Sequence, residues 1–169
     1  MTEKIKVRQV TEPAQKQQIV RQILEALPEW FEIESSREAY IAESAEMLTF
    51  AAFDGAEAVG FLCLKETGAA TVELAVTGVL KSHHRTGIGR MLFECARASA
   101  AASGYSFMQV KTVKMGVYPE YDATNRFYLA CGFQEFEVLP LWDEANPCQV
   151  YVLYLGADGE TGSAPADDS

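Results

Sequence analysis

The sequence predicts a mixed α/β fold, in which about four helices flank a sheet of six to seven mostly antiparallel strands with one parallel pair. Alternating apolar and polar residues, as in Ile5–Val10, indicate half-buried strands. Asp54-Gly55 lies between two apolar runs and is a strong turn signal for antiparallel strands. Between 71 and 113 a strand, a helix and a second strand follow one another, and a crossover of this size joins parallel strands with a right-handed connection.

Length and composition limit the class of protein. A chain of 169 residues with 49% hydrophobic residues can bury one core, so we expect one domain over 1–155 and a disordered acidic tail over 156–169. Apolar runs are too short for a membrane span and no signal peptide is visible, which predicts a cytoplasmic protein that does not bind membranes. The net charge of −10 argues against nucleic acid as a partner. The four cysteines show no metal-ligand spacing, so no metal site is predicted.

The first half of the chain is predicted to contain three strands and two helices. After the strand Ile5–Val10, a helix begins at Pro13 and stops before Pro28, because proline suits the first turn of a helix and interrupts its interior. A second helix is expected to begin at Ser35, which has capping-box spacing to Glu38. Two strands on either side of the Asp54-Gly55 turn follow, at 49–53 and 59–64.

The second half begins with a strand over 71–80, a short glycine loop and a helix. The helix ends at Gly104, a residue type that suits the left-handed position after a helix. Its expected apolar face comprises Ile88, Met91, Leu92, Cys95, Ser99 and Ala102.

The remaining elements are a strand over 107–113, a helix, and a final hairpin. Asp122 is a good N-cap, so the helix is expected to run from there to Cys131. The last strands are expected at 133–138 and 149–155, joined by a long loop that carries Trp142.

The glycine loop is the part of the sequence most directly linked to function. The first N–H groups of a helix have no intrahelical acceptors and lie at the positive end of its dipole, so they can bind a phosphate. Gly87 and Gly89 allow a sharp turn and a close approach of the phosphate to the backbone, and Arg85 and Arg90 can add positive charge. The loop lacks the Lys-Ser/Thr of a Walker motif, and Leu92 stands where a dinucleotide fingerprint has its third glycine.

At His84 to Gly89 the sequence resembles the GNAT family of acyl-CoA-dependent N-acetyltransferases. In that family a strand ending in Val leads into a loop R/Q-x-x-G-x-G/A, whose amides hold the pyrophosphate of coenzyme A. Here the strand ends at Val79 and His84 stands in place of Arg or Gln. A second match, Asn125 to Phe133, resembles the family's late helix and its Gly-Phe exit.

The resemblance implies the GNAT acyl-CoA N-acyltransferase fold, acetyl-CoA as cosubstrate, and direct transfer of the acetyl group to a primary amine in a ternary complex. The amine belongs to an unidentified small molecule or peptide, and the protein is expected to be a monomer or a homodimer. A non-catalytic acyl-CoA-binding sensor is the alternative. The residues that the resemblance assigns to the coenzyme are Gly78, Val79, His84, Arg85, Thr86, Gly87, Ile88, Gly89, Arg90, Asn125 and Tyr128.

Acetyl transfer to an amine needs a base for the ammonium, with a pKa of about 10.4, and an acid for the departing thiolate, with a pKa of about 8.5. Glu73, on the strand that leads to the loop, is the candidate base, because the histone-acetylating branch of the family carries its glutamate at this spacing. Tyr128 is the candidate acid, because many members place there a tyrosine that protonates the sulfur. The alternatives are a surface carboxylate for Glu73 and a core aromatic for Tyr128.

The acceptor side is less defined by the sequence. Lys111 and Tyr118 could contact either substrate or solvent. In the GNAT fold the connection between the first two helices borders the acceptor, although aromatic residues there could equally be core anchors. The candidate acceptor-binding residues are Trp30, Phe31, Tyr40 and Trp142.

Overall fold

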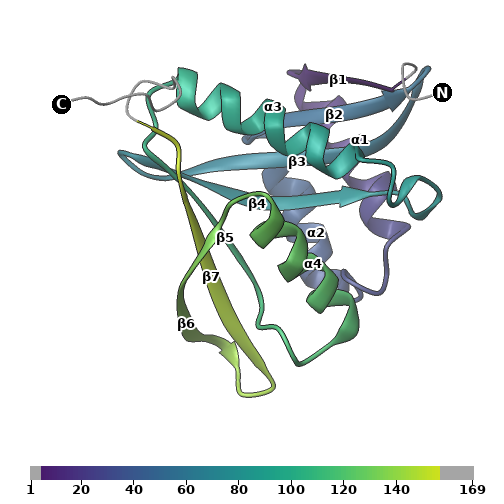
Figure 1. The fold of residues 1–169 in the computed structure, drawn as a ribbon. Coiled ribbons are helices and arrows are strands. Elements are labelled where there is room, and N and C mark those ends of the chain that lie inside the picture. Colours follow the sequence, from purple (N-terminus) through teal and green to yellow (C-terminus); the bar gives the residue numbers. More distant parts are fainter. Residues whose placement is uncertain (1–4, 157–169) are drawn as a thin grey trace. The chain divides into compact units, whose positions relative to one another are not determined.

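The computed structural model describes residues 5–156, which form seven strands, four α-helices and a short 3-10 helix (Figure 1). The predicted tail, 156–169, lies outside the described residues except for its first residue. In chain order the elements are β1 (Ile5–Val10), α1 (Pro13–Glu25), α2 (Glu34–Ser44), β2 (Leu48–Asp54), β3 (Glu57–Gly68), β4 (Thr71–Val79), η2 (Lys81–His83), α3 (Ile88–Ala102), β5 (Phe107–Val113), α4 (Pro119–Ala130), β6 (Gln134–Asp143) and β7 (Asn146–Tyr154). Within 5–156, none of the helices has the length and apolar character that crossing a membrane requires.

The strands follow the order β1-β2-β3-β4-β5-β7-β6, which confirms the mixed sheet predicted from the sequence. β1 with β2, β2 with β3, β5 with β7 and β6 with β7 are antiparallel. β4 and β5 form the parallel pair, as the strand–helix–strand crossover requires. Contacts group the chain into two compact units, and the unit boundaries fall within β3, β4 and α3.

Unit 1 comprises 1–65 and 75–96. Helix α3 packs on the face of the sheet toward which a side chain at Gly60 would point, because a Cβ added to Gly60 would lie 3.2 Å from both Ile88 and Leu92. A Cβ added to Gly78 would instead lie 3.0 Å from Leu27, just beyond α1. The absence of a side chain at both glycines therefore lets helices pack closely on both faces of β3 and β4. Figure 1 shows α3 on one side of β2 and β3, with α1 and α2 on the other.

Unit 2 comprises 66–74 and 97–169. Its described part contains the start of β4, the antiparallel strands β5, β7 and β6, and helix α4. α4 packs on β7, since the ring of Tyr128 lies 6.1 Å from that of Tyr151 and a Cβ added to Gly132 would meet Leu153 at 3.5 Å.

Both predicted side-chain caps are wrong. α2 begins at Glu34 with Ile33 at the N-cap, so Ser35 lies inside the first turn, and Glu38 binds Arg21 instead of closing a capping box. α4 begins at Pro119, whose fixed φ suits the first helical position, and this starts the helix about a turn earlier than expected. Asp122 lies within that helix and accepts a hydrogen bond from the Gly116 N–H at 2.7 Å.

The long loop predicted for the last hairpin is also wrong. β6 extends to Asp143 and β7 begins at Asn146, so the connection is a tight turn in which Asn146 Nδ2 donates to Asp143 Oδ1 at 2.8 Å. Pro140 suggested a loop, but β6 is the last strand of the sheet, and an edge strand tolerates proline. Trp142 is consequently a strand residue.

The apolar face predicted for α3 is partly wrong. Ile88 and Leu92 are buried as expected, together with Phe93 and Ala96, whereas Met91 is 37% exposed and Cys95 and Ala102 are exposed as well. A helix rich in small apolar residues presents more than one apolar stripe, and the close approach permitted by Gly60 selects the stripe through Ile88 and Leu92.

Candidate active site

The predicted site residues divide between the two units of the fold. Unit 1 holds the loop between β4 and α3 and the segment between α1 and α2. Unit 2 holds Glu73, Asn125, Tyr128 and Trp142.

The glycine loop forms the N-terminus of α3. Gly87 has φ +87°, a left-handed conformation that favours glycine, and its carbonyl oxygen accepts the first helical hydrogen bond from the Met91 N–H at 3.0 Å. The N–H groups of Ile88 and Gly89 therefore lie in the first turn, where a helix provides no acceptor for them. This geometry can bind an anion such as a pyrophosphate.

Arg85 is the only described residue other than glycine with a positive φ, at +64°. A left-handed arginine is strained relative to glycine, and such conformations concentrate at ligand-binding and catalytic loops. The loop that the sequence assigns to the coenzyme therefore contains two positive φ angles within three residues, at Arg85 and Gly87.

His84 turns back toward the strand. Its Nε2 lies 2.7 Å from the carbonyl oxygen of Val79, so this nitrogen donates the hydrogen bond, and its ring meets Trp30 edge-on with centroids 6.0 Å apart. The Lys81 ammonium also binds the carboxylate of Glu29. Two contacts thus tie the β4–α3 connection to the segment after α1, within unit 1, and the sequence did not reveal either.

The aromatic residues of unit 1 that are predicted to border the acceptor are partly buried. Phe31 and Tyr40 meet edge-on with centroids 6.1 Å apart, and both pack with Trp30 against the core beneath α1. In unit 2, Trp142 is 45% exposed on β6. Core anchors pack in the same way as Trp30, Phe31 and Tyr40, so the contact of these residues with an acceptor stays a prediction.

Glu73 lies on β4 beside Gln109 of β5, the last pair of the parallel ladder. Its Oε2 accepts a hydrogen bond from Lys111 Nζ at 3.1 Å, and the two side chains are only 17% and 25% exposed. The structure thus gives Lys111 an ion-pair partner on the neighbouring strand. The sequence contains both charged residues, but it does not show the strand register that brings their side chains together.

Asn125 and Tyr128 project from α4 toward Tyr151 on β7. Asn125 is fully buried, and its Nδ2 donates to the carbonyl oxygens of Val113 and Tyr121 at 2.8 and 2.7 Å. Its Oδ1 accepts a hydrogen bond from the Tyr151 hydroxyl at 2.5 Å. Both N–H groups of the Asn125 amide are therefore used within unit 2.

Tyr128 is 5% exposed, and its ring lies among three aromatic rings, those of Phe127, Phe133 and Tyr151, at centroid distances of 5.6 to 6.1 Å. Sequence reasoning missed Tyr151, because nothing in the alternating run of β7 distinguishes it from an ordinary core residue.

Glu73 and Tyr128 lie on opposite faces of the unit 2 sheet. Residues paired across strands share a face, so Glu73, Gln109 and Val152 lie on one face. Tyr151, one residue along β7, points to the other face, where it contacts α4 and Tyr128. The backbone of the sheet therefore separates the Glu73 carboxylate from the Tyr128 ring.

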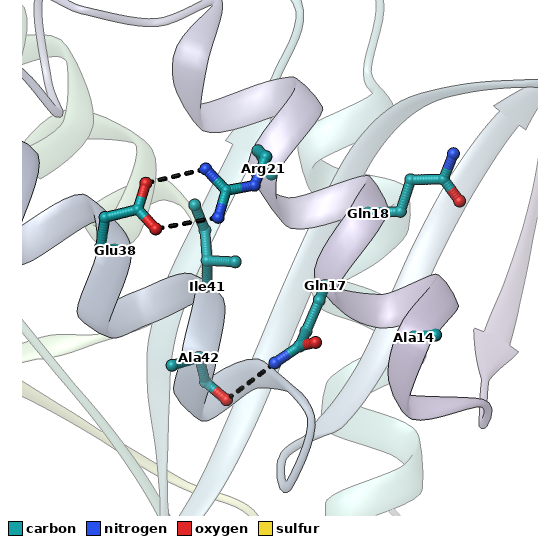
Figure 2. Close-up of a pocket in the computed structure, with 7 residues that line it drawn as sticks. All are labelled: Ala14, Gln17, Gln18, Arg21, Glu38, Ile41 and Ala42. Carbon is teal, nitrogen blue, oxygen red and sulfur yellow. Dashed lines mark hydrogen bonds and ion pairs between the residues drawn. The ribbon is translucent and has the colours of Figure 1, made fainter.

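A shallow pocket between α1 and α2 is not part of this arrangement (Figure 2). Arg21 donates two hydrogen bonds of 2.8 Å to the carboxylate of Glu38 across it, and Gln17 donates one to the carbonyl oxygen of Ala42. None of the residues assigned to the coenzyme, the acceptor or catalysis lines it. These contacts hold two helices together.

The sequence profile of the GNAT acetyltransferase domain matches residues 45–135, more than half of the chain. This chain belongs to the GNAT acetyltransferase family. It is therefore a transferase, and the general reaction of its family is acetyl transfer to an amine. No curated protein sequence matches the chain.

Solved structures share the fold. A GNAT-family protein from Desulfovibrio desulfuricans has a TM-score of 0.77 at 21% identity, covering 90% of this chain and 99% of its own. An aminoglycoside 6'-N-acetyltransferase complexed with coenzyme A has a TM-score of 0.71 at 17% identity, covering 96% and 99%. A GNAT acetyltransferase from Elizabethkingia anophelis with acetyl-CoA bound has a TM-score of 0.66 at 15% identity, covering 90% and 99%.

Proposed function

We propose that this protein binds acetyl-CoA through the loop before α3 and transfers its acetyl group directly to a primary amine. The observation that supports this most is the left-handed Gly87 at the start of α3, which exposes first-turn N–H groups for a pyrophosphate. The residues proposed to hold the coenzyme are those of the loop, His84 to Arg90, with Gly78 and Val79 at the end of β4.

In the proposed mechanism the carboxylate of Glu73 takes a proton from the acceptor ammonium, directly or through water. The amine nitrogen then attacks the thioester carbon, the C–N bond forms and the C–S bond breaks, and the nitrogen releases its second proton to solvent to give the neutral amide. The phenol of Tyr128 gives its proton to the departing sulfur. Unit 2 offers a separate group for each role, a carboxylate on β4 and a phenol on α4.

The developing oxyanion needs a donor, and we propose a main-chain N–H at Gly78 or Val79. Gly78 has little room for a side chain, since an added Cβ would lie 3.0 Å from Leu27 and 3.3 Å from Ile23. Asn125 is proposed to support the coenzyme side through the position of Tyr128, because its amide hydrogens are already bonded within the protein.

Calorimetric titration of acetyl-CoA tests the coenzyme site, with Gly87→Ala as the loop variant. Gly55→Ala is a matched control, because both glycines have positive φ, at +87° and +64°, and an added Cβ meets nothing within 4 Å at either position. Both substitutions should destabilise the fold by about 1–2 kcal/mol through left-handed strain. Only Gly87→Ala should weaken acetyl-CoA binding.

Equal affinities of the wild type and both variants would exclude the loop as the coenzyme site. Absence of acetyl-CoA binding to the wild type would overturn the proposed function itself. Binding without thiol release, for any amine offered, would indicate an acyl-CoA sensor instead of an enzyme.

A further inference from the structure

The ion pair between Glu73 and Lys111 places a fixed cation at the carboxylate that is proposed to receive the acceptor's proton. Lys111 Nζ lies 3.1 Å from Glu73 Oε2, and both side chains are mostly shielded from water. Lys111 follows Gln109 by two residues on β5, so all three side chains lie on one face of the unit 2 sheet. Gln109 is already bonded, since its Nε2 donates to Thr67 Oγ1 at 3.1 Å.

An acceptor amine arrives as a second cation at the same carboxylate. If it displaces Lys111, the lysine ammonium is left without its partner in a mostly buried position, and breaking such a pair is strongly unfavourable. If Lys111 stays, two ammonium groups approach each other at short range in a medium of low effective dielectric constant. A simple cationic amine is therefore disfavoured by the pair in either case.

An acceptor that carries its own anion avoids this penalty. Its ammonium can take the place of Lys111 on Glu73, while its anion takes the place of Glu73 on Lys111, so every charge keeps a partner. An α-amino acid carries both charges on one carbon, and Glu73 and Lys111 hold their own two charges in direct contact. The amino terminus of a peptide and the amines of an aminoglycoside or a polyamine have no carboxylate at that position.

We propose that the acceptor is an α-amino acid or a close analogue with a carboxylate next to its primary amine, and that Lys111 is a positioning residue that binds this carboxylate. This inference rests on the proposed function, in which Glu73 receives the acceptor's proton. The side chain of the acceptor is expected to be apolar, because Val113, Cys148 and Val150 border Lys111 on the same face and are all buried.

The experiment compares acceptors that differ only in the carboxylate. Leucine is paired with isopentylamine, phenylalanine with phenethylamine, and leucinamide serves as an acceptor whose carboxylate has lost its charge. Formation of each N-acetyl product is followed by mass spectrometry at saturating acetyl-CoA. In the wild type, kcat/KM is expected to be at least about tenfold higher for leucine and phenylalanine than for the amines that lack the carboxylate, a difference of about 1.4 kcal/mol.

Three variants separate recognition by Lys111 from a structural role. Lys111→Gln keeps a hydrogen-bond donor for Glu73 but removes the charge, and it should abolish the preference for the carboxylate, mainly through a higher KM. Lys111→Arg keeps the charge and should retain the preference. Lys114→Gln removes an exposed cation one residue beyond β5 and should change nothing.

Several outcomes would overturn the inference. A wild type that acetylates isopentylamine and phenethylamine as well as or better than the amino acids contradicts it, and so does a Lys111→Gln variant that retains the preference. Acetyl-CoA binding without acetylation of any of these acceptors also excludes this acceptor class. After that last result, thiol release with any other primary amine would leave the proposed function standing without this inference. Absence of acetyl-CoA binding to the wild type would instead remove the proposed function itself.

Discussion

At the scale of single residues, Tyr128 and Tyr151 differ in role: Tyr128 is the proposed acid, and the hydroxyl of Tyr151 supports the fold. Both rings belong to the same aromatic cluster, with centroids 6.1 Å apart, but the Tyr151 hydroxyl is bonded to the buried oxygen of Asn125. Removal of a hydroxyl from each tyrosine keeps the ring packing and tests the two oxygens separately.

Tyr128→Phe should lower kcat by roughly a hundredfold or more, because loss of a general acid typically costs a factor of that size, and should leave acetyl-CoA binding unchanged. Tyr151→Phe should instead lower the free energy of unfolding by about 1–3 kcal/mol, because the Asn125 oxygen loses its donor. Steady-state kinetics and chemical denaturation of both variants measure the two effects. Unchanged kcat in Tyr128→Phe would exclude the phenol as the acid.

Cysteine reactivity offers a second test at this scale. Burial raises the pKa of the Cys63 thiol to about 12, partly offset by its hydrogen bond with Thr49, and burial also raises the pKa of the Cys148 thiol. Cys95 is exposed on α3. Because the thiolate is the reactive form, a thiol reagent at pH 8 should modify Cys95 in the native protein and all four cysteines after unfolding. Rapid modification of Cys63 in the native protein would contradict this burial.

At the scale of elements, the α1–α2 pair depends on a polar clamp as well as on apolar burial. Arg21 binds Glu38 through two hydrogen bonds, and these lower the pKa of the Glu38 carboxyl below its ordinary value (Figure 2). A carboxylate whose pKa is lower in the folded state than in the unfolded state stabilises the fold at pH values above the unfolded pKa. That contribution disappears as the pH falls through the folded pKa.

Glu38→Gln should therefore lower Tm slightly at pH 7. The difference from the wild type should begin to shrink at about pH 4.3, the ordinary pKa of a glutamate, and should disappear as the pH falls further through the lower folded pKa. Both side chains of the clamp are about half exposed, so the effect should also shrink at high salt. Calorimetric scans of the two proteins between pH 7 and pH 3 measure this. A Tm difference that does not change with pH would assign the effect to packing instead of charge.

At the scale of the whole molecule, the sequence predicted the order and type of the four α-helices and seven strands, because hydrophobic periodicity and turn residues act locally, but it missed the short 3-10 helix η2. It misplaced the start of α4, because Pro119 suits a loop as well as the first position of a helix. It also misplaced the end of β6, because Pro140 suits a loop as well as an edge strand, and only the sheet order shows that β6 lies at the edge. The sequence predicted the glycine loop through its spacing. It could not show the Glu73–Lys111 pair or the bond between Asn125 and Tyr151, because both depend on strand register.

Binding of acetyl-CoA should stabilise the whole fold, because a ligand that binds only the folded state shifts the unfolding equilibrium. At a ligand concentration of 100 times the dissociation constant the gain is about 2.7 kcal/mol. For a chain of this length each kcal/mol raises Tm by roughly 2–4 °C, so the expected rise is about 5–10 °C. Gly55→Ala should show the same rise from a lower starting Tm, and Gly87→Ala should show a smaller one, since its first-turn N–H groups no longer have the backbone geometry proposed to bind the coenzyme. An equal rise in Gly87→Ala would mean that acetyl-CoA binds the fold without this loop.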